Sequence, residues 1–233
     1  MNKKVLIGVV ATIAVGGLSF VGYKAYTYNC YKVDKEDKVE RLKFSKTLSV
    51  KQSEKVSDYA EFGNLKFQNI FEGYEKKESE NKVTYSKKND KGKEQVITIS
   101  KSEGIVKDIL DNKKTDDKSY NKIDKKEFIE KYKIKNDIDL IKYLQGKRRV
   151  DVNMFTSKSI LQEQYFLDMT EVLHFNTDSS RVWIKAPYEG YIRLDKNVEN
   201  IIIFDEKYKY EISFVGDYSY MTVTDFLKTI SVK

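Results

Sequence analysis

Residues able to perform acid–base or metal chemistry are few in this chain. It has one histidine, His174, and one cysteine, Cys30, beside 36 aspartates and glutamates. Zinc sites and Ser or Cys catalytic centres normally need a histidine close to the other ligands or the nucleophile. His174 has only Glu171 and Asp178 near it in sequence, and we interpret it as a structural residue at a helix end. We therefore expect no catalytic residue, no metal site and no cofactor.

Carboxylates are the remaining candidates for catalysis. Two acids that face each other across a cleft can hydrolyse a glycosidic bond without a histidine. No spacing in the sequence selects such a pair, so a carboxylate-based envelope hydrolase is kept as an alternative function. It would require two converging acids, at least one with a raised pKa. Nucleotide hydrolysis is disfavoured, because no glycine cluster that could bind phosphate occurs outside the N-terminal segment.

The charge of the chain argues against nucleic-acid binding. The formal net charge is +7, but several of the lysines flank the N-terminal apolar segment and the rest are mixed with acids. Only five of the 43 basic residues are arginines, the side chains that bind phosphates and guanine edges in a fork. We expect no nucleic-acid partner.

The N-terminal segment is the longest apolar stretch. Residues 5–23 carry no charge, and as a helix these 19 residues would span about 28 Å, close to the hydrocarbon thickness of a bilayer. No small-residue cleavage site follows. We therefore predict that residues 1–24 form a membrane anchor, a transmembrane helix that is retained as a signal anchor.

Small residues line one face of this predicted helix. Gly8, Thr12 and Gly16 recur at four-residue spacing, which favours close helix approach and a weak dimer. Cys30 excludes an internal disulfide; it is either an unpaired thiol or the site of a disulfide between two copies. The residues before Cys30 do not match the lipoprotein motif, so we expect no lipidation.

The orientation of the anchor is open to two interpretations. More basic residues follow the apolar segment than precede it, which would keep the following domain in the cytoplasm, associated with anionic lipid. A short basic start before an apolar run is nevertheless typical of export, and long domains are translocated largely regardless of charge. We favour a single-pass cell-membrane protein with an extracytoplasmic domain. The polar residues 25–40 are expected to form a stalk.

Residues 41–233 are expected to form a globular α+β domain. The charged stretch near residues 113–122 could divide it into two lobes. Periodicity and turn signals predict strands at residues 42–50, 65–72, 83–85, 96–99, 181–184, 190–194, 201–204 and 208–214. They predict helices at residues 53–62, 102–112, 124–132, 136–146, 157–172 and 222–230. The fold class is thus an N-terminal transmembrane helix followed by an antiparallel β-sheet flanked by helices.

Local signals fix some of these elements. Asp124 and Glu127 make a capping box, and Asn136 is placed to cap the next helix. Near the C-terminus, the sequence Tyr210 to Phe214 followed by Thr224 to Ile230 resembles the closing strand and helix of uncharacterised Gram-positive membrane-anchored or lipoprotein-like extracytoplasmic domains. The resemblance covers about 25 residues, and it implies no activity.

Two sets of residues are candidates for binding. The lone tryptophan Trp183 and the nearby Tyr188 and Tyr191 offer aromatic surfaces for a ligand, although the same residues could pack in the core. The densest basic cluster contains Lys147, Arg148 and Arg149 and could contact anionic groups.

The sequence thus predicts a non-catalytic membrane protein whose extracytoplasmic domain binds an envelope component. Its partners would be the membrane and either an envelope polymer or another membrane protein. A carboxylate-based hydrolase and a cytoplasm-facing domain on anionic lipid are the alternatives.

Overall fold

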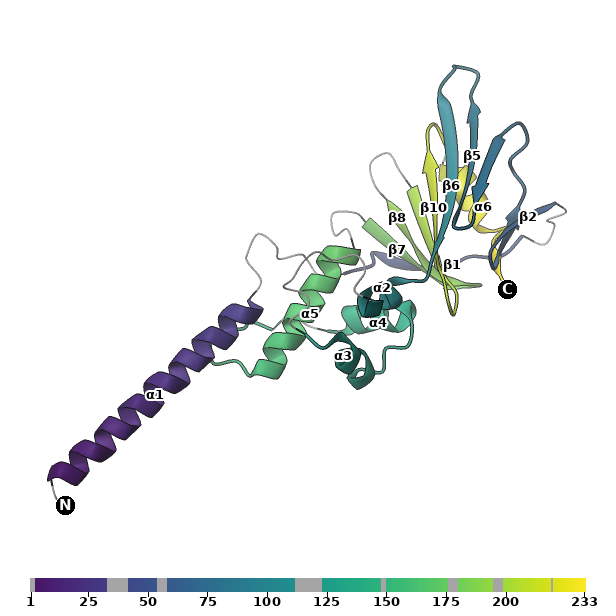
Figure 1. Ribbon diagram of the computed structural model, residues 1–233. Coiled ribbons are helices and arrows are strands. Elements are labelled where there is room, and N and C mark those ends of the chain that lie inside the picture. Colours follow the sequence, from purple (N-terminus) through teal and green to yellow (C-terminus); the bar gives the residue numbers. More distant parts are fainter. Residues whose placement is uncertain are drawn as a thin grey trace. The chain divides into compact units, whose positions relative to one another are not determined.

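The structure, a computed structural model, describes residues 3–32, 42–53, 58–111, 123–147, 150–175, 180–194, 199–218 and 220–233 (Figure 1). Within these ranges the chain is α+β, with one large mixed sheet and six helices. It divides into two compact units. The helical unit comprises residues 1–41 and 147–175, and the sheet unit comprises residues 42–146 and 176–233. The predicted lobe boundary near residues 113–122 lies outside the described residues.

The helical unit contains α1 (Lys3–Tyr31) and α5 (Lys158–His174). The C-terminal end of α1 packs against α5, where the rings of Tyr31 and Tyr165 lie 6.0 Å apart. Gln162 Nε2 donates a hydrogen bond to the Tyr31 hydroxyl at 3.1 Å. Aromatic packing and a side-chain bond therefore hold the end of α1 on α5.

The prediction of a transmembrane helix at residues 5–23 is wrong. No helix in the described part of the chain is both long and apolar enough to cross a membrane. Beyond the predicted segment the same helix contains Lys24 and Asn29, and Thr27 is 6% exposed. The helix also continues past the predicted segment to Tyr31, where it packs on protein rather than ending at Tyr23. The prediction that residues 1–24 are a membrane anchor retained as a signal anchor is therefore also wrong.

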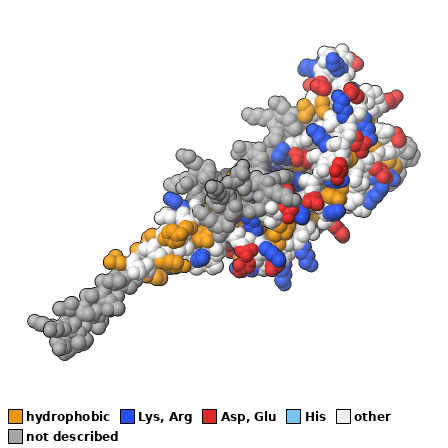
Figure 2. Space-filling model, viewed as in Figure 1, with side chains coloured by type: hydrophobic (Ala, Val, Ile, Leu, Met, Phe, Trp, Pro, Cys, Tyr) orange, Lys and Arg blue, Asp and Glu red, His pale blue; other side chains and the backbone are white. Residues whose placement is uncertain are grey.

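The exposed part of α1 is nevertheless apolar. Figure 2 shows hydrophobic side chains along it. The large ones are 43–74% exposed, namely Leu18, Phe20, Val21, Tyr23 and Tyr26. The predicted dimer face, Gly8, Thr12 and Gly16, lies in the preceding turns of α1, whose side chains are outside the described ones.

The sheet unit is built on an eight-stranded sheet. Its strands follow the spatial order β1-β7-β8-β9-β10-β6-β5-β4. Their bounds are β1 Lys46–Ser49, β4 Glu75–Ser79, β5 Lys82–Lys88, β6 Glu94–Ser102, β7 Ser180–Ala186, β8 Glu189–Leu194, β9 Glu199–Phe204 and β10 Lys209–Val215. β1 pairs with β7 in parallel, while the other neighbouring strands are antiparallel. The prediction of an antiparallel sheet is corrected to a mixed one. The first strand of the chain, β1, lies parallel to its neighbour β7, which is far from it in sequence.

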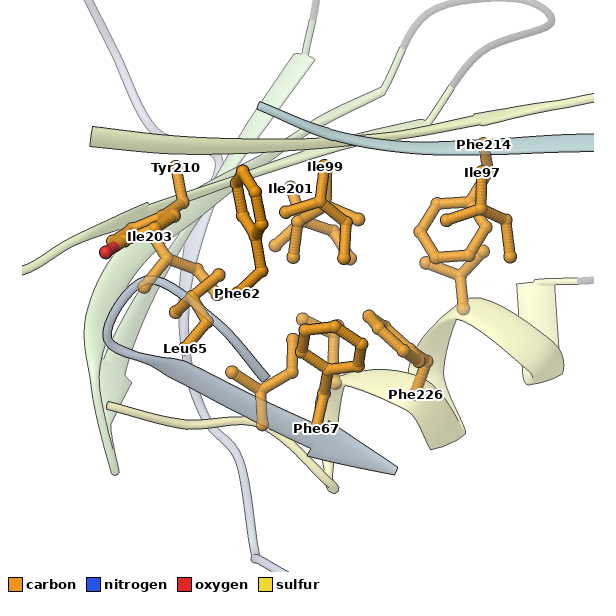
Figure 3. Close-up of a cluster of buried hydrophobic side chains, with 14 of the residues drawn as sticks. Phe62, Leu65, Phe67, Ile97, Ile99, Ile201, Ile203, Tyr210, Phe214 and Phe226 are labelled. Atoms are coloured by element: carbon orange, nitrogen blue, oxygen red, sulfur yellow. The ribbon is translucent and has the colours of Figure 1, made fainter. Parts of the chain in front are cut away.

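A second layer covers one face of this sheet. It consists of a small sheet in the order β11-β3-β2, with bounds Ser231–Val232, Leu65–Gln68 and Tyr59–Phe62, and of α6 (Tyr220–Leu227). Figure 3 shows Phe67 of β3 and Phe226 of α6 pointing toward Ile97 and Ile99 of β6. Both isoleucines and Phe67 are 0% exposed. The core of the sheet unit therefore lies between the large sheet and this layer.

The predicted helix at residues 53–62 is wrong in its described part. Tyr59–Phe62 is β2, which forms a hairpin with β3. The turn is Gly63-Asn64, and Gly63 has φ +61°, a conformation that suits glycine. Pairing with β3 thus overrides the helical spacing of Val56, Tyr59 and Ala60. The C-terminal helix also differs from its prediction, since α6 begins at Tyr220 and ends at Leu227.

Three short helices complete the sheet unit, α2 (Ile105–Asp111), α3 (Lys125–Lys131) and α4 (Asp137–Gly146). The predicted caps are confirmed. Asp124 Oδ1 accepts a hydrogen bond from the Glu127 amide at 2.9 Å, and Asn136 Oδ1 accepts one from the Asp139 amide at 3.0 Å. These bonds satisfy amides in the first turns of α3 and α4.

Candidate functional site

Polar side chains on the face of the large sheet opposite the core lie in register across six strands. Thr98 of β6 pairs with Thr84 of β5 on one side and with Ser213 of β10 on the other. Directly paired residues of neighbouring strands point to the same face, about 4.8 Å apart. The neighbours of Thr98 in β6, Ile97 and Ile99, point into the core, so Thr98 points away from it. The whole set, called here the polar row, is Thr84, Thr98, Ser213, Asn200, Arg193 and Arg181.

The polar row is accessible along β5, β6 and β10, and two of its other three residues are buried. Thr84, Thr98 and Ser213 are half-exposed, and their hydroxyls make no hydrogen bond to the described residues. Asn200 and Arg181 are 4% and 3% exposed. The Asn200 Oδ1 atom accepts no hydrogen bond from the described part of the chain. Binding groups are therefore accessible on β5, β6 and β10.

A charged pair and aromatic rings flank the row. Arg193 Nη2 lies 3.9 Å from Glu211 Oε1, and both side chains are half-exposed. Trp183 and Tyr191 are directly paired neighbours in β7 and β8. The Phe44 ring lies 5.3 Å from that of Trp183 and 5.6 Å from that of Tyr191, in edge contacts. This aromatic cluster shares the face of the polar row.

The structure separates the third predicted aromatic from the other two. Tyr188 is 6% exposed, and its hydroxyl donates a hydrogen bond of 2.8 Å to the Leu227 carbonyl in the core. Burial raises its pKa. Tyr191 is also 6% exposed, and burial raises its pKa to about 12, opposed by the charges of Arg181 and Arg193. Of the predicted ligand surface, Trp183 is the half-exposed member.

The predicted basic cluster is only partly described. Lys147 Nζ lies 2.9 Å from Glu163 Oε1, so its charge is paired within the helical unit. Arg148 and Arg149 lie outside the described residues. On the sheet unit, Figure 2 shows basic and acidic side chains intermingled. This view shows no broad basic field over the described residues of the sheet unit.

A cavity of about 190 Å³ lies beside the β9–β10 turn and is called here the turn cavity. Its apolar lining comes from Val106 and Leu110 of α2, Phe204 of β9 and Tyr208 of the turn. Polar lining comes from the segment before α2, from the α3–α4 connection and from the turn itself. These residues include Glu103, Lys135, Asp137, Asp205, Glu206 and Lys207.

Asp137 is the buried acid of the turn cavity. It is 7% exposed, and its two carboxylate oxygens accept hydrogen bonds from the Ile105 and Val106 amides at 2.8 and 2.9 Å. Burial raises the pKa of Asp137, opposed by these two bonds and by the charge of Lys209. The carboxylate therefore caps α2 from the start of α4.

The second acid of the cavity is also engaged. Asp205 Oδ1 accepts from the amides of Lys207 and Tyr208, and Oδ2 accepts from Asn64 Nδ2 at 2.9 Å. Both carboxylates thus hold backbone or side-chain donors in place. No group of His, Cys, Asp and Glu within the described ranges is arranged to hold a metal ion.

Sequence reasoning missed both the polar row and Asp137. One signal pointed to Asp137: Gly104 precedes α2, and glycine has no side chain to cap the first amides of a helix. Such amides are satisfied by water or by a group from elsewhere in the chain, and in the structure Asp137 is that group. The polar row gave no local signal, because its hydroxyls come from strands far apart in sequence. Comparison of the chain with protein-family models, curated proteins and solved structures gave no match.

Proposed function

We propose that the sheet unit is a non-catalytic binding domain whose polar row binds a polysaccharide of the cell envelope. The observation that carries this proposal is the register of Thr84, Thr98 and Ser213, whose half-exposed hydroxyls lie side by side on three neighbouring strands. An extracytoplasmic location is part of the same proposal.

The spacing of the row suits a glycan chain that crosses the strands. Neighbouring strands are about 4.8 Å apart, which is close to the length of one sugar unit in an extended glycan. Each sugar would then meet one hydroxyl that can both donate and accept a hydrogen bond. No hydrogen bond to the described residues competes for the hydroxyls of Thr84, Thr98 and Ser213.

Side chains beside the row supply the other contacts that sugars use. Arg193 and Glu211 are half-exposed and offer donors and acceptors to hydroxyl or amide groups of a ligand. Trp183 and Phe44 are also half-exposed on this face and present apolar surface for the carbon-bound hydrogens of a sugar ring. The intermingled charges on the sheet unit favour an uncharged polymer over a strongly anionic one.

Binding without catalysis is supported by the acids of the turn cavity. A carboxylate pair for glycoside hydrolysis needs free oxygens aimed at the substrate. Asp137 has a raised pKa, as a catalytic acid would, but both of its oxygens already accept backbone hydrogen bonds. Asp205 also has both oxygens engaged, Oδ1 by backbone amides and Oδ2 by the Asn64 side chain.

The test is co-sedimentation of the full chain with insoluble peptidoglycan, chitin and cellulose. We expect binding to at least one of them. Thr98→Arg places a long charged side chain between the hydroxyls of Thr84 and Ser213 and should abolish binding. Thr98→Val, which removes one hydroxyl, should weaken binding about 2- to 10-fold. Ser231→Arg is the matched control, because Ser231 is half-exposed in a strand of the small sheet.

Two results would overturn the proposal. One is that none of the three polysaccharides retains the protein. The other is that Thr98→Arg binds as well as Ser231→Arg, because the contact surface would then lie away from the polar row.

A further inference from the structure

We propose that the turn cavity is a second binding site, which accepts one apolar side chain of a peptide segment from a partner protein. The cavity lies between α2 and the β9–β10 turn, and the polysaccharide proposal does not use it. The ligand class follows from its size, its walls and the charges at its rim.

The size of the turn cavity fits one aromatic or branched aliphatic side chain. An apolar cavity of about 150 Å³ is enough to hold a benzene molecule. The turn cavity measures about 190 Å³ and opens to solvent. It therefore has room for a single ring, with little space left for a second.

Four residues supply the apolar part of the cavity wall. Val106 and Leu110 come from α2, Phe204 from β9 and Tyr208 from the β9–β10 turn. Leu110 is 42% exposed. Because Leu110 continues the apolar surface out to the rim, a ligand longer than one ring would remain in contact with protein as it leaves the cavity. This favours a peptide over an isolated small molecule.

The charges available to a ligand lie at the rim and are of both signs. The carboxylates of Asp137 and Asp205 are satisfied by donors of the protein itself. Lys135 and Lys207 are exposed, as are Glu103 and Glu206. An apolar residue flanked by one acidic and one basic residue complements this arrangement, whereas a strongly anionic or cationic ligand would meet like charges.

The test is a titration of the full ¹⁵N-labelled chain with two capped tripeptides, followed by NMR. We expect the acetylated, amidated Glu-Phe-Lys peptide to cause saturable shifts at the amides of Gly104, Lys107 and Tyr208. The Glu-Ala-Lys peptide, which lacks the ring, should bind at least about tenfold more weakly, equivalent to ~1.4 kcal/mol. Equal shifts from both peptides, no saturable shift, or shifts that map elsewhere would overturn the proposal.

Two variants separate the cavity from general apolar surface. Leu110→Lys removes the apolar rim of the cavity and should weaken binding of the Phe peptide about tenfold. Val215→Lys changes an apolar residue of similar exposure, 48% against 42%, that does not line the cavity. It should bind as the unchanged protein does. If Leu110→Lys, with its spectrum showing the native fold, binds the Phe peptide as well as Val215→Lys does, the site is not the turn cavity.

Discussion

The carboxylate of Asp137 fills the space that a side chain at position 104 would need. A Cβ atom on Gly104 would lie 2.9 Å from Asp137 Oδ2, and Gly104 has φ +92°. The same carboxylate accepts hydrogen bonds from the two amides that follow Gly104. The start of α2, and with it one wall of the turn cavity, therefore depends on glycine at one position and on a carboxylate at the other.

Gly104→Ala should destabilise the protein by about 2–4 kcal/mol, because it adds the cost of a left-handed backbone to the displacement of Asp137. Gly73→Ala is the matched control, since Gly73 also has a positive φ, +75°, but a Cβ atom there would meet nothing within 4 Å. That control should cost only about 1–2 kcal/mol. Urea unfolding of both variants measures the difference. Equal losses would mean that the Asp137 carboxylate moves aside without cost.

Asp137→Asn should lower stability and also change its dependence on pH. An amide keeps one acceptor oxygen, so one buried backbone amide loses its partner at a cost of about 1–3 kcal/mol. Burial raises the pKa of Asp137 above its unfolded value, so unfolding releases a proton as the pH rises past about 4. The contribution of Asp137 to the free energy of unfolding therefore falls as the pH rises through its folded pKa. The Asp137→Asn variant lacks this fall.

The measurement is the free energy of unfolding of both proteins from about pH 3.5 to about pH 8, a range that begins below the ordinary pKa of an aspartate. The advantage of the unchanged protein over Asp137→Asn should shrink as the pH rises. An advantage that grows with pH would contradict the raised pKa, because it would show that the folded state favours the charged carboxylate.

Much of the strand and helix pattern was predictable, because it depends on neighbours in sequence. The alternation of Tyr210, Ile212 and Phe214 marks the buried face of β10, and these residues are 0–2% exposed. The caps Asp124 and Asn136 need only donors three residues away. The hairpin of Tyr59–Phe62 was missed although Gly63-Asn64 is a turn signal, because the apolar residues before it also fit a helix.

The candidate site was less predictable, since it depends on strand pairing. Alternation within β8 separates two faces but does not say which face the other strands cover. Trp183 and Tyr191 thus proved to share a face, while Tyr188 packs toward Leu227. The hydroxyls of Thr98 and Ser213 are neighbours only because β6 pairs with β10, which lies over a hundred residues further along the chain.

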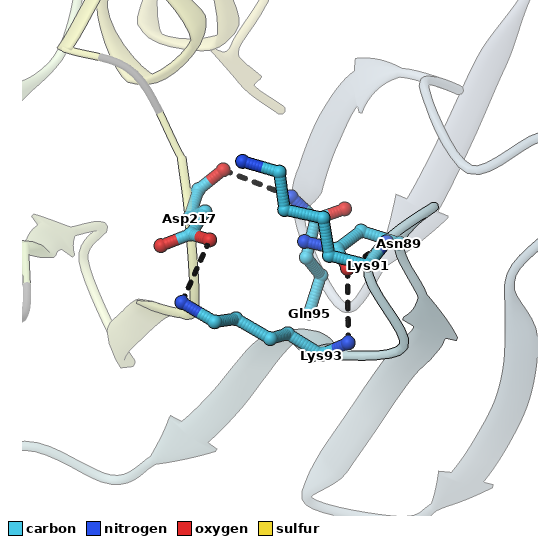
Figure 4. A network of polar contacts seen from close by, with 5 residues as sticks. All are labelled: Asn89, Lys91, Lys93, Gln95 and Asp217. Carbon is cyan, nitrogen blue, oxygen red and sulfur yellow. Dashed lines mark hydrogen bonds and ion pairs between the residues drawn. The ribbon is translucent and has the colours of Figure 1, made fainter.

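Gly216→Ala should be far more damaging than the loss of its charged neighbour Asp217. Figure 4 shows Asp217 beside the β5–β6 turn, where its carboxylate lies 3.5 Å from Lys93 Nζ and its carbonyl accepts a hydrogen bond from Gln95 Nε2. Gly216 has φ +117°, and a Cβ atom there would lie 2.7 Å from the Glu94 carbonyl oxygen. We expect Gly216→Ala to cost about 2–4 kcal/mol.

Asp217→Asn is the matched comparison. The Lys93 and Asp217 side chains are 67% and 61% exposed, and exposed ion pairs contribute about 0–1 kcal/mol. The carbonyl that Gln95 binds is unchanged in this variant. Thermal unfolding should therefore show a small shift for Asp217→Asn and a large one for Gly216→Ala. The reverse order would show that the ion pair, rather than the backbone conformation, holds this turn in place.

Tyr191→Phe should make the protein more resistant to alkaline unfolding. Burial raises the pKa of Tyr191 from 10.0 to about 12. Since the folded pKa is the higher one, unfolding releases a proton above pH 10, and stability falls between about pH 10 and pH 12 by up to ~2–3 kcal/mol. Phenylalanine has no proton to release, so this part of the fall disappears. Urea unfolding between about pH 10 and pH 12 measures the fall in the free energy of unfolding. Tyr59→Phe is the control, because Tyr59 is 42% exposed. Equal curves for both variants would mean that the Tyr191 hydroxyl reaches solvent and that the aromatic cluster is open to ligands at that residue.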